Sequence, residues 1–302
     1  MKRLSREDYP LLKGFFECQP YRISSYSLPS LIVWSSDCHG SYYSIVDGMV
    51  IIQSETQGCR DKRPLIMPIV PSGLPAPALL MEILRQTGIR EICYVPGDYV
   101  ESVGRSALEA SFTIVEQKEY EDYIYLTKDL AELRGNRYAK KRNLLHQFAR
   151  EYGSRNRVET GRITASVVPE CLDFLEKWCK QRECEVGQEE NTACEKAAVI
   201  GSLNSIEELD WRGLWVRVDG EMSAFAVMSH LTSEMGTLNF EKAYPHIKGL
   251  YQFLDNECAR ELFDGYAYIN KESDMGLPAL AASKRSYHPV EMLKSYSLRI
   301  KD

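Results

Sequence analysis

Three polar residues in the last third of the chain are the strongest candidates for chemistry. Glu241 lies in a strand-like segment, and Asn270 and Glu272 stand at the end of a later one, where α/β folds commonly hold ligands. A carboxylate there can act as a general base or orient an amine, and the Asn270 amide can polarise a carbonyl. The same residue types also serve as turn formers and surface ion pairs, so that interpretation stays open.

A loop with a glycine precedes the amphipathic segment that follows Glu241. Lys248, Gly249 and Leu250 stand at the expected start of a helix. Backbone N–H groups at a helix N-terminus favour anions, and glycine lets the backbone approach a phosphate closely. The loop therefore predicts a phosphate site, although a plain turn has the same pattern.

One stretch is strongly basic although the whole chain is acidic. From Arg134 to Arg157 there are eight Lys and Arg against the single Glu151, while the formal net charge of the chain is −6. A helix is expected over 136–152, and its first two turns would present four cations: Arg137, Lys140, Lys141 and Arg142. Cations at this end of the helix dipole are unfavourable by on the order of a few tenths of a kcal/mol each. The pattern favours an anionic partner such as RNA, a cofactor phosphate or a lipid headgroup; a solvated basic face is the alternative.

The elements that position these residues follow from a repeat. Two segments each contain a hairpin with Asp-Gly at its turn, at Asp47-Gly48 and Asp219-Gly220, and this dipeptide favours a type I′ turn. A strand, a loop with proline and glycine, an amphipathic helix and another strand follow in each copy. These lie at 65–70, 71–73, 75–86 and 91–95 in the first copy, and at 237–243, 245–249, 250–263 and 266–270 in the second. The repeat predicts two α/β lobes.

Only the second copy carries a carboxylate at the equivalent place. Glu241 stands eight residues before the loop glycine, and counting back from the first loop gives the apolar Leu65. Strict alternation along the second strand would put Asn239 and Glu241 on one face and Leu238, Phe240 and Lys242 on the other. If there is a reaction, we expect it in the second lobe.

Composition and terminal sequence limit the class of protein. The chain has 302 residues, of which 44% are hydrophobic and 26% charged, as in ordinary folded proteins of one or two domains. No apolar run approaches the roughly 18 residues of a membrane-spanning helix, and Met1 to Asp8 carries charges of both signs without a following apolar stretch. We therefore expect a cytoplasmic protein without a membrane span.

The cysteines predict neither disulfides nor a metal site. Nine are present, an odd number with no C-x-x-C pair, so we expect nine reduced thiols. The group Cys179, Cys184 and Cys194, beside His39 or His230, matches no zinc-ligand spacing. We expect no bound metal.

Several of these segments together resemble a known family. They are Tyr138 to Asn143 with Phe148, Val218-Asp219-Gly220, Phe240 to Ala243, Lys248 to Gln252, and Asn270 to Gly276 with Lys284, Tyr287 and Pro289. In order and spacing the chain resembles the C-terminal domain of bacterial phosphatidylglycerol lysyltransferases and its stand-alone relatives. One departure is Lys271, where the family often has arginine, so that a bidentate anion contact is lost.

The resemblance implies an α/β (α+β) fold that is a tandem of two GNAT-like acyltransferase lobes, related to the Fem-type aminoacyl-tRNA-dependent transferases. We expect a non-catalytic lobe over 1–118 and a lobe with the active cleft over 119–302. In that superfamily the acyl donor lies between splayed strands, with its phosphates at the loop before the central helix. By position that loop is Lys248-Gly249-Leu250. The family's lipid-modifying enzymes carry a large membrane domain, so we do not expect lipid lysylation here.

The expected function is an acyl or aminoacyl transferase in which an amine or hydroxyl attacks an activated donor. Glu241 would orient or deprotonate the acceptor, helped by Glu272, and Asn270 would stabilise the oxyanion. Lys248, the Gly249 backbone and Lys284 would hold the donor, and the basic helix would bind tRNA or another polyanion. The donor would be aminoacyl-tRNA or acyl-CoA, with no tightly bound cofactor and no DNA.

Two alternatives remain open at this point. A non-catalytic ligand or nucleic-acid binding module could keep the fold and lose the reaction. A plain acetyl-CoA acetyltransferase would need a loop richer in glycine. A Glu241 that pairs only with a structural lysine would favour the binding module.

Overall fold

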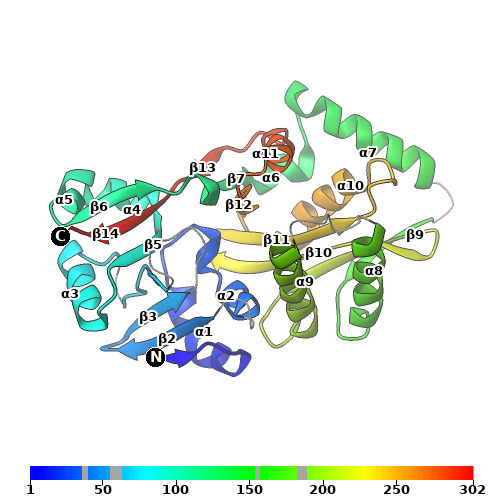
Figure 1. Ribbon diagram of the computed structural model, residues 1–302. Coiled ribbons are helices and arrows are strands. Elements are labelled where there is room, and N and C mark those ends of the chain that lie inside the picture. Colours follow the sequence, from blue (N-terminus) through cyan, green and yellow to red (C-terminus); the bar gives the residue numbers. More distant parts are fainter. Residues whose placement is uncertain (36–39, 55–62, 72, 154–156, 182–188, 302) are drawn as a thin grey trace.

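The computed structural model describes residues 1–35, 40–54, 63–71, 73–153, 157–181 and 189–301, which form two lobes lying side by side (Figure 1). In the described chain each lobe is built on one seven-stranded mixed sheet. The first sheet has the order β1 (Lys2–Arg3), β2 (Ser41–Val46), β3 (Met49–Ser54), β4 (Leu65–Ile66), β5 (Glu91–Pro96), β14 (Ser295–Ile300) and β6 (Phe112–Glu116). The second has the order β13 (Glu291–Leu293), β7 (Asp122–Leu126), β12 (Tyr268–Asn270), β11 (Met235–Ala243), β10 (Glu221–Thr232), β9 (Arg212–Val218) and β8 (Val158–Arg162).

The repeat expected from the sequence is present in both sheets. The hairpins β2–β3 and β9–β10 are antiparallel, and both turn at an Asp-Gly pair with positive φ: 49° and 74° at Asp47 and Gly48, and 56° and 81° at Asp219 and Gly220. These angles are those of the type I′ turn, which matches the twist of the flanking strands. In each copy a third strand then pairs in parallel with the strand that follows the helix, as β4 with β5 and β11 with β12.

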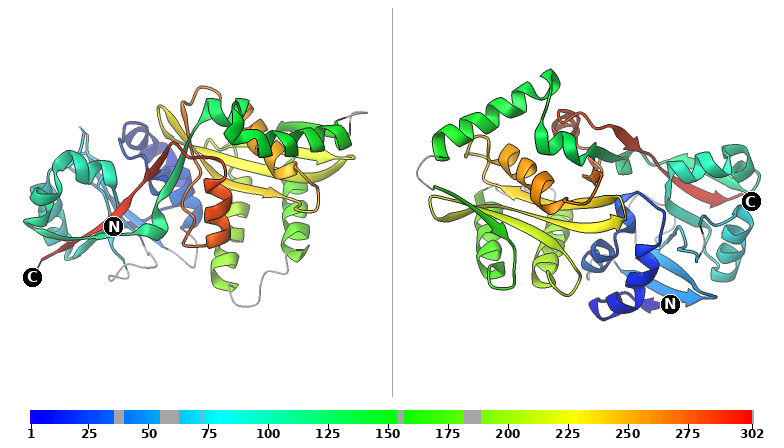
Figure 2. Two further views of the ribbon diagram at one scale, coloured as in Figure 1. Left: turned by 90° about the horizontal axis from the view of Figure 1, so that it is seen from above. Right: turned by 180° about the vertical axis from the view of Figure 1, so that it is seen from behind.

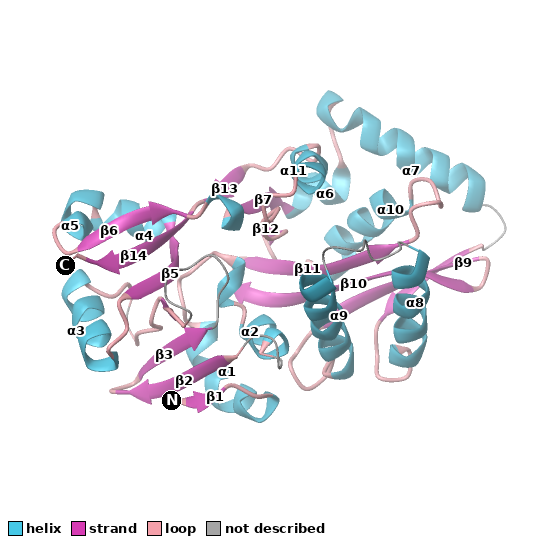
Figure 3. Cartoon of the chain, viewed as in Figure 1, coloured by secondary structure: helices cyan, strands magenta, loops and turns pink. Residues whose placement is uncertain are grey.

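One strand from the second half of the chain joins the first sheet. β7 lies between β12 and β13 of the second sheet, whereas β14 at the end of the chain lies between β5 and β6 of the first (Figure 3). The predicted strand over 295–300 is therefore correct, but it belongs to the first lobe. Apart from β14, the strands of the first sheet lie before the expected boundary at 118/119 and those of the second sheet lie after it.

Helices cover both faces of the second sheet. In the first lobe the helices are α1 (Tyr9–Glu17), α2 (Leu28–Trp34), α3 (Pro77–Thr87), α4 (Gly97–Val103) and α5 (Arg105–Glu109). Those that follow are α6 (Thr127–Glu132), α7 (Ala139–Tyr152), α8 (Val168–Gln181), α9 (Glu189–Asn204), α10 (Leu250–Glu257), continued by the π-helical turn η5 (Cys258–Leu262), and α11 (Pro278–Arg285). Two views show α8 and α9 on one face of the sheet and α10, overlaid by α7, on the other (Figures 1 and 2). Short 3₁₀ turns are η1 (Arg6–Asp8), η2 (Ser24–Tyr26), η3 (Lys118–Tyr120) and η4 (Asn136–Tyr138).

The two lobes share one continuous interface. α2 packs on α9 and β10, and one hydrophobic core runs from the first sheet to the α8–α9 face of the second. Polar bonds fix the contact: the Ser27 hydroxyl lies 2.7 Å from the Ser229 hydroxyl, and the Gln19 amide donates to the Leu231 carbonyl at 2.9 Å. Such buried bonds between apolar layers hold the lobes in one arrangement.

The cysteines correct one expectation. Cys93, buried on β5, is disulfide-bonded, so the prediction of nine reduced thiols is wrong at this residue. Sequence spacing does not reveal which Cβ atoms come within disulfide distance in a fold. Among the described residues, Cys18, Cys171 and Cys258 carry free thiols.

Membrane-spanning helices and metal-ligand groups can be looked for among the described residues. None of their helices is long and apolar enough to cross a membrane. Among the same residues, no three His, Cys, Asp or Glu side chains are grouped as metal ligands; of the weighed zinc group, His39 and Cys184 lie outside the described residues.

Candidate active site

The second sheet opens between β11 and β12. The two strands pair in parallel only from Met235 and Tyr268 to Thr237 and Asn270, and β11 then continues to Ala243 without β12 beside it. In parallel sheets, ligands bind where neighbouring strands part at their carboxyl ends. The opening therefore lies where the family resemblance puts the acyl donor.

A β-bulge at Asn239 shapes this opening. On the β10 side Met228 pairs with Leu238 and Val227 with Phe240, so Asn239 is an extra residue. The expected strict alternation is wrong here, because Leu238 packs in the α10-side core and Phe240 in the core on the opposite face. A bulge shifts the alternation by one residue and re-aims the side chains that follow.

Two groups of polar side chains lie beside the opening. Asn239 accepts a hydrogen bond from Ser229 at 2.7 Å and donates its amide to Glu272 Oε1 at 3.0 Å. Lys271 Nζ lies 3.3 Å from Glu241 Oε2 and also forms an ion pair with Asp255 of α10. Lys271 thus lies between the carboxylates of Glu241 and Asp255, whereas the predicted Glu272 belongs to a separate group with Asn239 and Ser229.

Glu241 combines a raised pKa with a carboxylate oxygen that accepts no hydrogen bond from the described part of the chain. Burial, with the charge of Asp255 acting in the same direction, raises its pKa to about 7, although Lys271 opposes the shift. Its Oε1 atom is buried and has no hydrogen-bond partner among the described residues. A buried carboxylate oxygen without a partner is costly, and a pKa near neutrality suits a general base.

Two further groups border the Glu241 cluster. Lys141 Nζ of α7 lies 3.5 Å from the centre of the Tyr287 ring and donates to the Ser286 hydroxyl at 2.7 Å. Burial lowers the pKa of Lys141 to about 8. The Tyr287 hydroxyl is buried beside Asp255 and Gln252. Lys141 therefore lies beside the Glu241 cluster.

Asn270 is fully bonded within the protein. Its amide donates to the Arg22 carbonyl at 3.0 Å and to Asp122 at 2.8 Å, and its oxygen accepts from the Glu272 backbone N–H at 2.7 Å. The expected oxyanion role would require one of these N–H bonds to break. What the contacts show is that Asn270 fixes the backbone of Glu272, which has a φ of 57°.

Lys284 also holds this loop. Its ammonium donates to the carbonyls of Lys271 at 2.5 Å, Glu272 at 3.2 Å and Ser273 at 2.6 Å, so all three of its protons are engaged. Burial lowers the pKa of Lys284 to about 8, and burial raises the pKa of Glu272 to about 8. Lys284 thus holds the backbone of residues 271–273 in place and serves as a clamp on this loop, whereas we expected it to face a donor.

The expected phosphate loop is covered by α7. Gly249 has a φ of 85°, and a Cβ at this position would lie 2.4 Å from the Leu144 carbonyl oxygen. Leu250 is fully buried, and its N–H bonds to the Ile247 carbonyl at 3.2 Å, while Lys248 is exposed. The α7 backbone thus occupies the space beside Gly249 that a phosphate would need. Of the three residues of this loop, Lys248 is the one exposed to solvent.

Most cations of the basic segment have partners nearby. Arg137 pairs with Asp129 at 2.6 Å, and Arg142 donates to the Gly135 carbonyl at 2.6 Å and to that of Leu133. Lys140 is exposed. Because carbonyls and acids of the α6–α7 connection offset these charges, the unfavourable dipole position by itself does not require a polyanion.

The first lobe fills the same opening with a tyrosine. Beyond the short β4–β5 pairing, the Tyr26 hydroxyl accepts from the Met67 N–H at 3.0 Å and donates to the Tyr94 carbonyl at 2.8 Å. It thus bridges the two backbones where they diverge. This plug gives a physical reason for the expectation that the first lobe is not catalytic.

Sequence reasoning missed Asp255 and Tyr287 as parts of the site. Asp255 follows the buried Leu254 in an amphipathic helix, and a buried acid within such a stripe is the only signal it offers. Its proximity to Lys271 depends on how α10 lies against the sheet, which spacing along the chain does not encode.

The fold and this opening define a tandem of GNAT-like lobes, the class expected from the sequence. Residues 20–299 match the family described as "Phosphatidylglycerol lysyltransferase, C-terminal". The chain belongs to this family.

Two solved structures of similar proteins share the fold. A conserved protein of unknown function from Bacteroides thetaiotaomicron is 28% identical, with 99% of each chain covered and a TM-score of 0.88. The C-terminal domain of a protein from Agrobacterium fabrum, assigned as a lysylphosphatidylglycerol synthetase, is 16% identical, with 98% of this chain and 92% of that one covered and a TM-score of 0.64. A tandem GNAT protein from the clavulanic acid biosynthesis pathway is a distant likeness, with 8% identity, coverage of 100% and 98%, and a TM-score of 0.45. No curated protein matches the chain.

Proposed function

We propose that the second lobe transfers an acyl or aminoacyl group from an activated donor to an amine, with Glu241 as the general base. The observation that carries the proposal is the unpartnered, buried Oε1 of Glu241 at the opening between β11 and β12. With a pKa raised by burial to about 7, this carboxylate is partly ionised at neutral pH and can accept a proton.

The step balances with groups already in the cluster. The amine nitrogen bonds to the donor carbonyl carbon and loses a proton to Glu241 Oε1. The bond from that carbon to the leaving oxygen of a tRNA ribose, or to the sulfur of coenzyme A, then breaks. Lys141, whose pKa is lowered by burial to about 8, supplies a proton to the leaving group, and solvent restores both residues. Lys271 holds the second oxygen of Glu241 throughout.

Family membership favours aminoacyl-tRNA as the donor. The Agrobacterium fabrum relative is assigned as a synthetase of an aminoacylated lipid, and the exposed Lys140 and Lys248 are available for a polyanion. Acyl-CoA is the other activated donor with phosphates for Lys248. The acceptor is a small amine or hydroxyl compound, and a lipid headgroup belongs to this class.

The proposal is tested by a transfer assay on the purified protein. tRNA charged with radiolabelled amino acids, and separately labelled acetyl-CoA, are incubated with a panel of amines and headgroup alcohols. The variant E241Q should lose at least about a hundredfold in transfer rate, as expected on removing a general base. E221Q changes an exposed glutamate on the neighbouring strand and should keep the wild-type rate. Transfer that E241Q leaves intact contradicts the role of Glu241.

One observation favours the second candidate, a non-catalytic binding module. Lys271 lies between Glu241 and Asp255 as a structural cation would. If this candidate is right, the protein binds charged tRNA or acyl-CoA, and neither donor loses its acyl group to any acceptor. Single-turnover measurements at saturating protein separate the two functions.

A further inference from the structure

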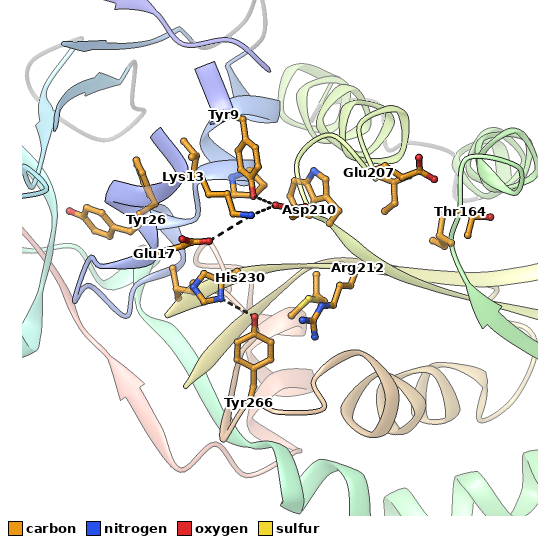
Figure 4. Close-up of a pocket in the computed structure, with 18 residues that line it drawn as sticks. Tyr9, Lys13, Glu17, Tyr26, Thr164, Glu207, Asp210, Arg212, His230 and Tyr266 are labelled. Atoms are coloured by element: carbon orange, nitrogen blue, oxygen red, sulfur yellow. Dashed lines mark hydrogen bonds and ion pairs between the residues drawn. The ribbon is translucent and has the colours of Figure 1, made fainter. Parts of the chain in front are cut away.

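A cavity of about 610 Å³ lies between the lobes, away from the opening described above (Figure 4). α1 and α2 of the first lobe form one side, and the end of β10 with the segment leading into β9 forms the other. On β10, the cavity residue His230 pairs with Gly236 at the start of β11, whereas Glu241 pairs with Ala226 further along. The cavity is therefore distinct from the proposed transfer site.

The wall of this cavity combines apolar and polar side chains. Its aromatic and aliphatic part includes Phe16, Leu28, Ile163, Ile206, Trp211 and Met228. A volume of several hundred Å³ is typical of small-molecule sites. The size and the mixed lining suit one compact molecule that has both an apolar part and charged groups.

The charges of the cavity are arranged as two opposite poles. Lys13 lies 2.7 Å from Asp210, which also accepts a hydrogen bond from Tyr9 at 3.0 Å, so this pair is internally balanced. Glu207 faces outward and accepts from the Ala165 N–H at 3.4 Å. Glu17, 3.7 Å from Lys13, and Arg212 remain on opposite sides (Figure 4).

Arg212 is the positive pole. Its guanidinium donates to the Leu262 carbonyl at 3.3 Å and lies 5.6 Å from the centre of the Tyr266 ring. Within the described residues no carboxylate pairs with it. Several of its N–H donors are therefore available in the fork geometry that matches a carboxylate.

The side of the cavity beside Glu17 is closed by a neutral polar pair. His230 Nδ1 lies 2.9 Å from the Tyr266 hydroxyl, and burial lowers the pKa of His230. The imidazole is uncharged, and Glu17 and Asp210 share the ammonium of Lys13. This side of the cavity therefore keeps a net negative charge that can hold a cation.

We propose that this cavity binds a free α-amino acid with an apolar side chain. Its carboxylate lies on Arg212, its ammonium on Glu17, and its side chain against Phe16 and Trp211. The ligand contacts both lobes, so its binding stabilises their interface. The site is independent of the transfer reaction and requires no donor.

Calorimetric titration of the full chain tests the proposal with matched probes. L-Phenylalanine and L-leucine carry both charges, phenethylamine lacks the carboxylate, and 3-phenylpropionate lacks the ammonium. At least one of the amino acids should bind. For phenylalanine, each single-charge analogue should bind at least about tenfold more weakly, because each loses a charge-assisted hydrogen bond.

Variants assign the two poles. R212Q should weaken amino-acid binding at least about tenfold and abolish the preference for phenylalanine over phenethylamine. E17Q should abolish the preference over 3-phenylpropionate. E101Q, at an exposed site on α4, should bind as wild type. R212K keeps the charge without the fork and gives an intermediate affinity if folding is intact.

Three results would overturn the proposal. They are no binding of either amino acid at millimolar concentration, equal affinity for phenylalanine and both of its analogues, and binding unchanged in folded R212Q and E17Q. Because the readout is binding, loss of transfer activity in other variants has no bearing on it.

Discussion

Replacing Glu241 with glutamine should stabilise the protein at pH 8. The pKa of this carboxyl rises from the ordinary 4.5 to about 7 in the folded state, so the folded protein holds its proton more tightly than the unfolded chain. The stability associated with that proton is fully present below pH 4.5 and is lost as the pH rises through 7. At about 1.4 kcal/mol per pH unit the ionised Glu241 costs about 3 kcal/mol at pH 8.

E241Q removes this cost, because glutamine does not ionise. Its free energy of unfolding, measured by urea denaturation at 25 °C, should exceed that of the wild type by about 2–3 kcal/mol at pH 8 and by less than about 1 kcal/mol at pH 5. E221Q should show no such pH dependence. Destabilisation of E241Q at pH 8 would instead mean that the ion pair with Lys271 outweighs burial, and the reasoning would fail.

Three further predictions concern Tyr26, Lys140 and Lys284. Y26F should lower the free energy of unfolding by about 1–3 kcal/mol, because the Met67 N–H loses its buried acceptor, and should leave transfer unchanged; loss of transfer would show that the first lobe takes part. K140Q should reduce the slope of log affinity for tRNA against log salt by about 1, a change that filter binding at several salt concentrations measures and that an unaltered slope would exclude. K284M, which loses three bonds to loop carbonyls, should be less stable by about 2 kcal/mol or more, and a melting temperature equal to the wild type would contradict the clamp.

The sequence was most informative where local chemistry decides the structure. The Asp-Gly turns required positive φ angles and gave both hairpins, and the helical spacing of apolar residues located the α3 and α10 segments. Such features depend on neighbours in the chain. They were enough to predict the two lobes.

The remaining features arise from packing between distant segments. The insertion of β14 between β5 and β6 of the first sheet depends on contacts with strands far away in the sequence, and nothing in β14 itself marks it. The bulge at Asn239 looks like ordinary alternation in the sequence. The turning of Lys141 toward Tyr287, and the covering of Gly249 by α7, depend on how helices lie against one another.

The most direct test of the central claim is the pH dependence of kcat/KM for transfer by the wild-type protein. If Glu241 is the base, kcat/KM falls tenfold per pH unit below an apparent pKa of about 7, and the residual activity of E241Q lacks this step. A wild-type profile that stays flat from pH 5 to pH 8, or one that E241Q reproduces, would contradict the assignment.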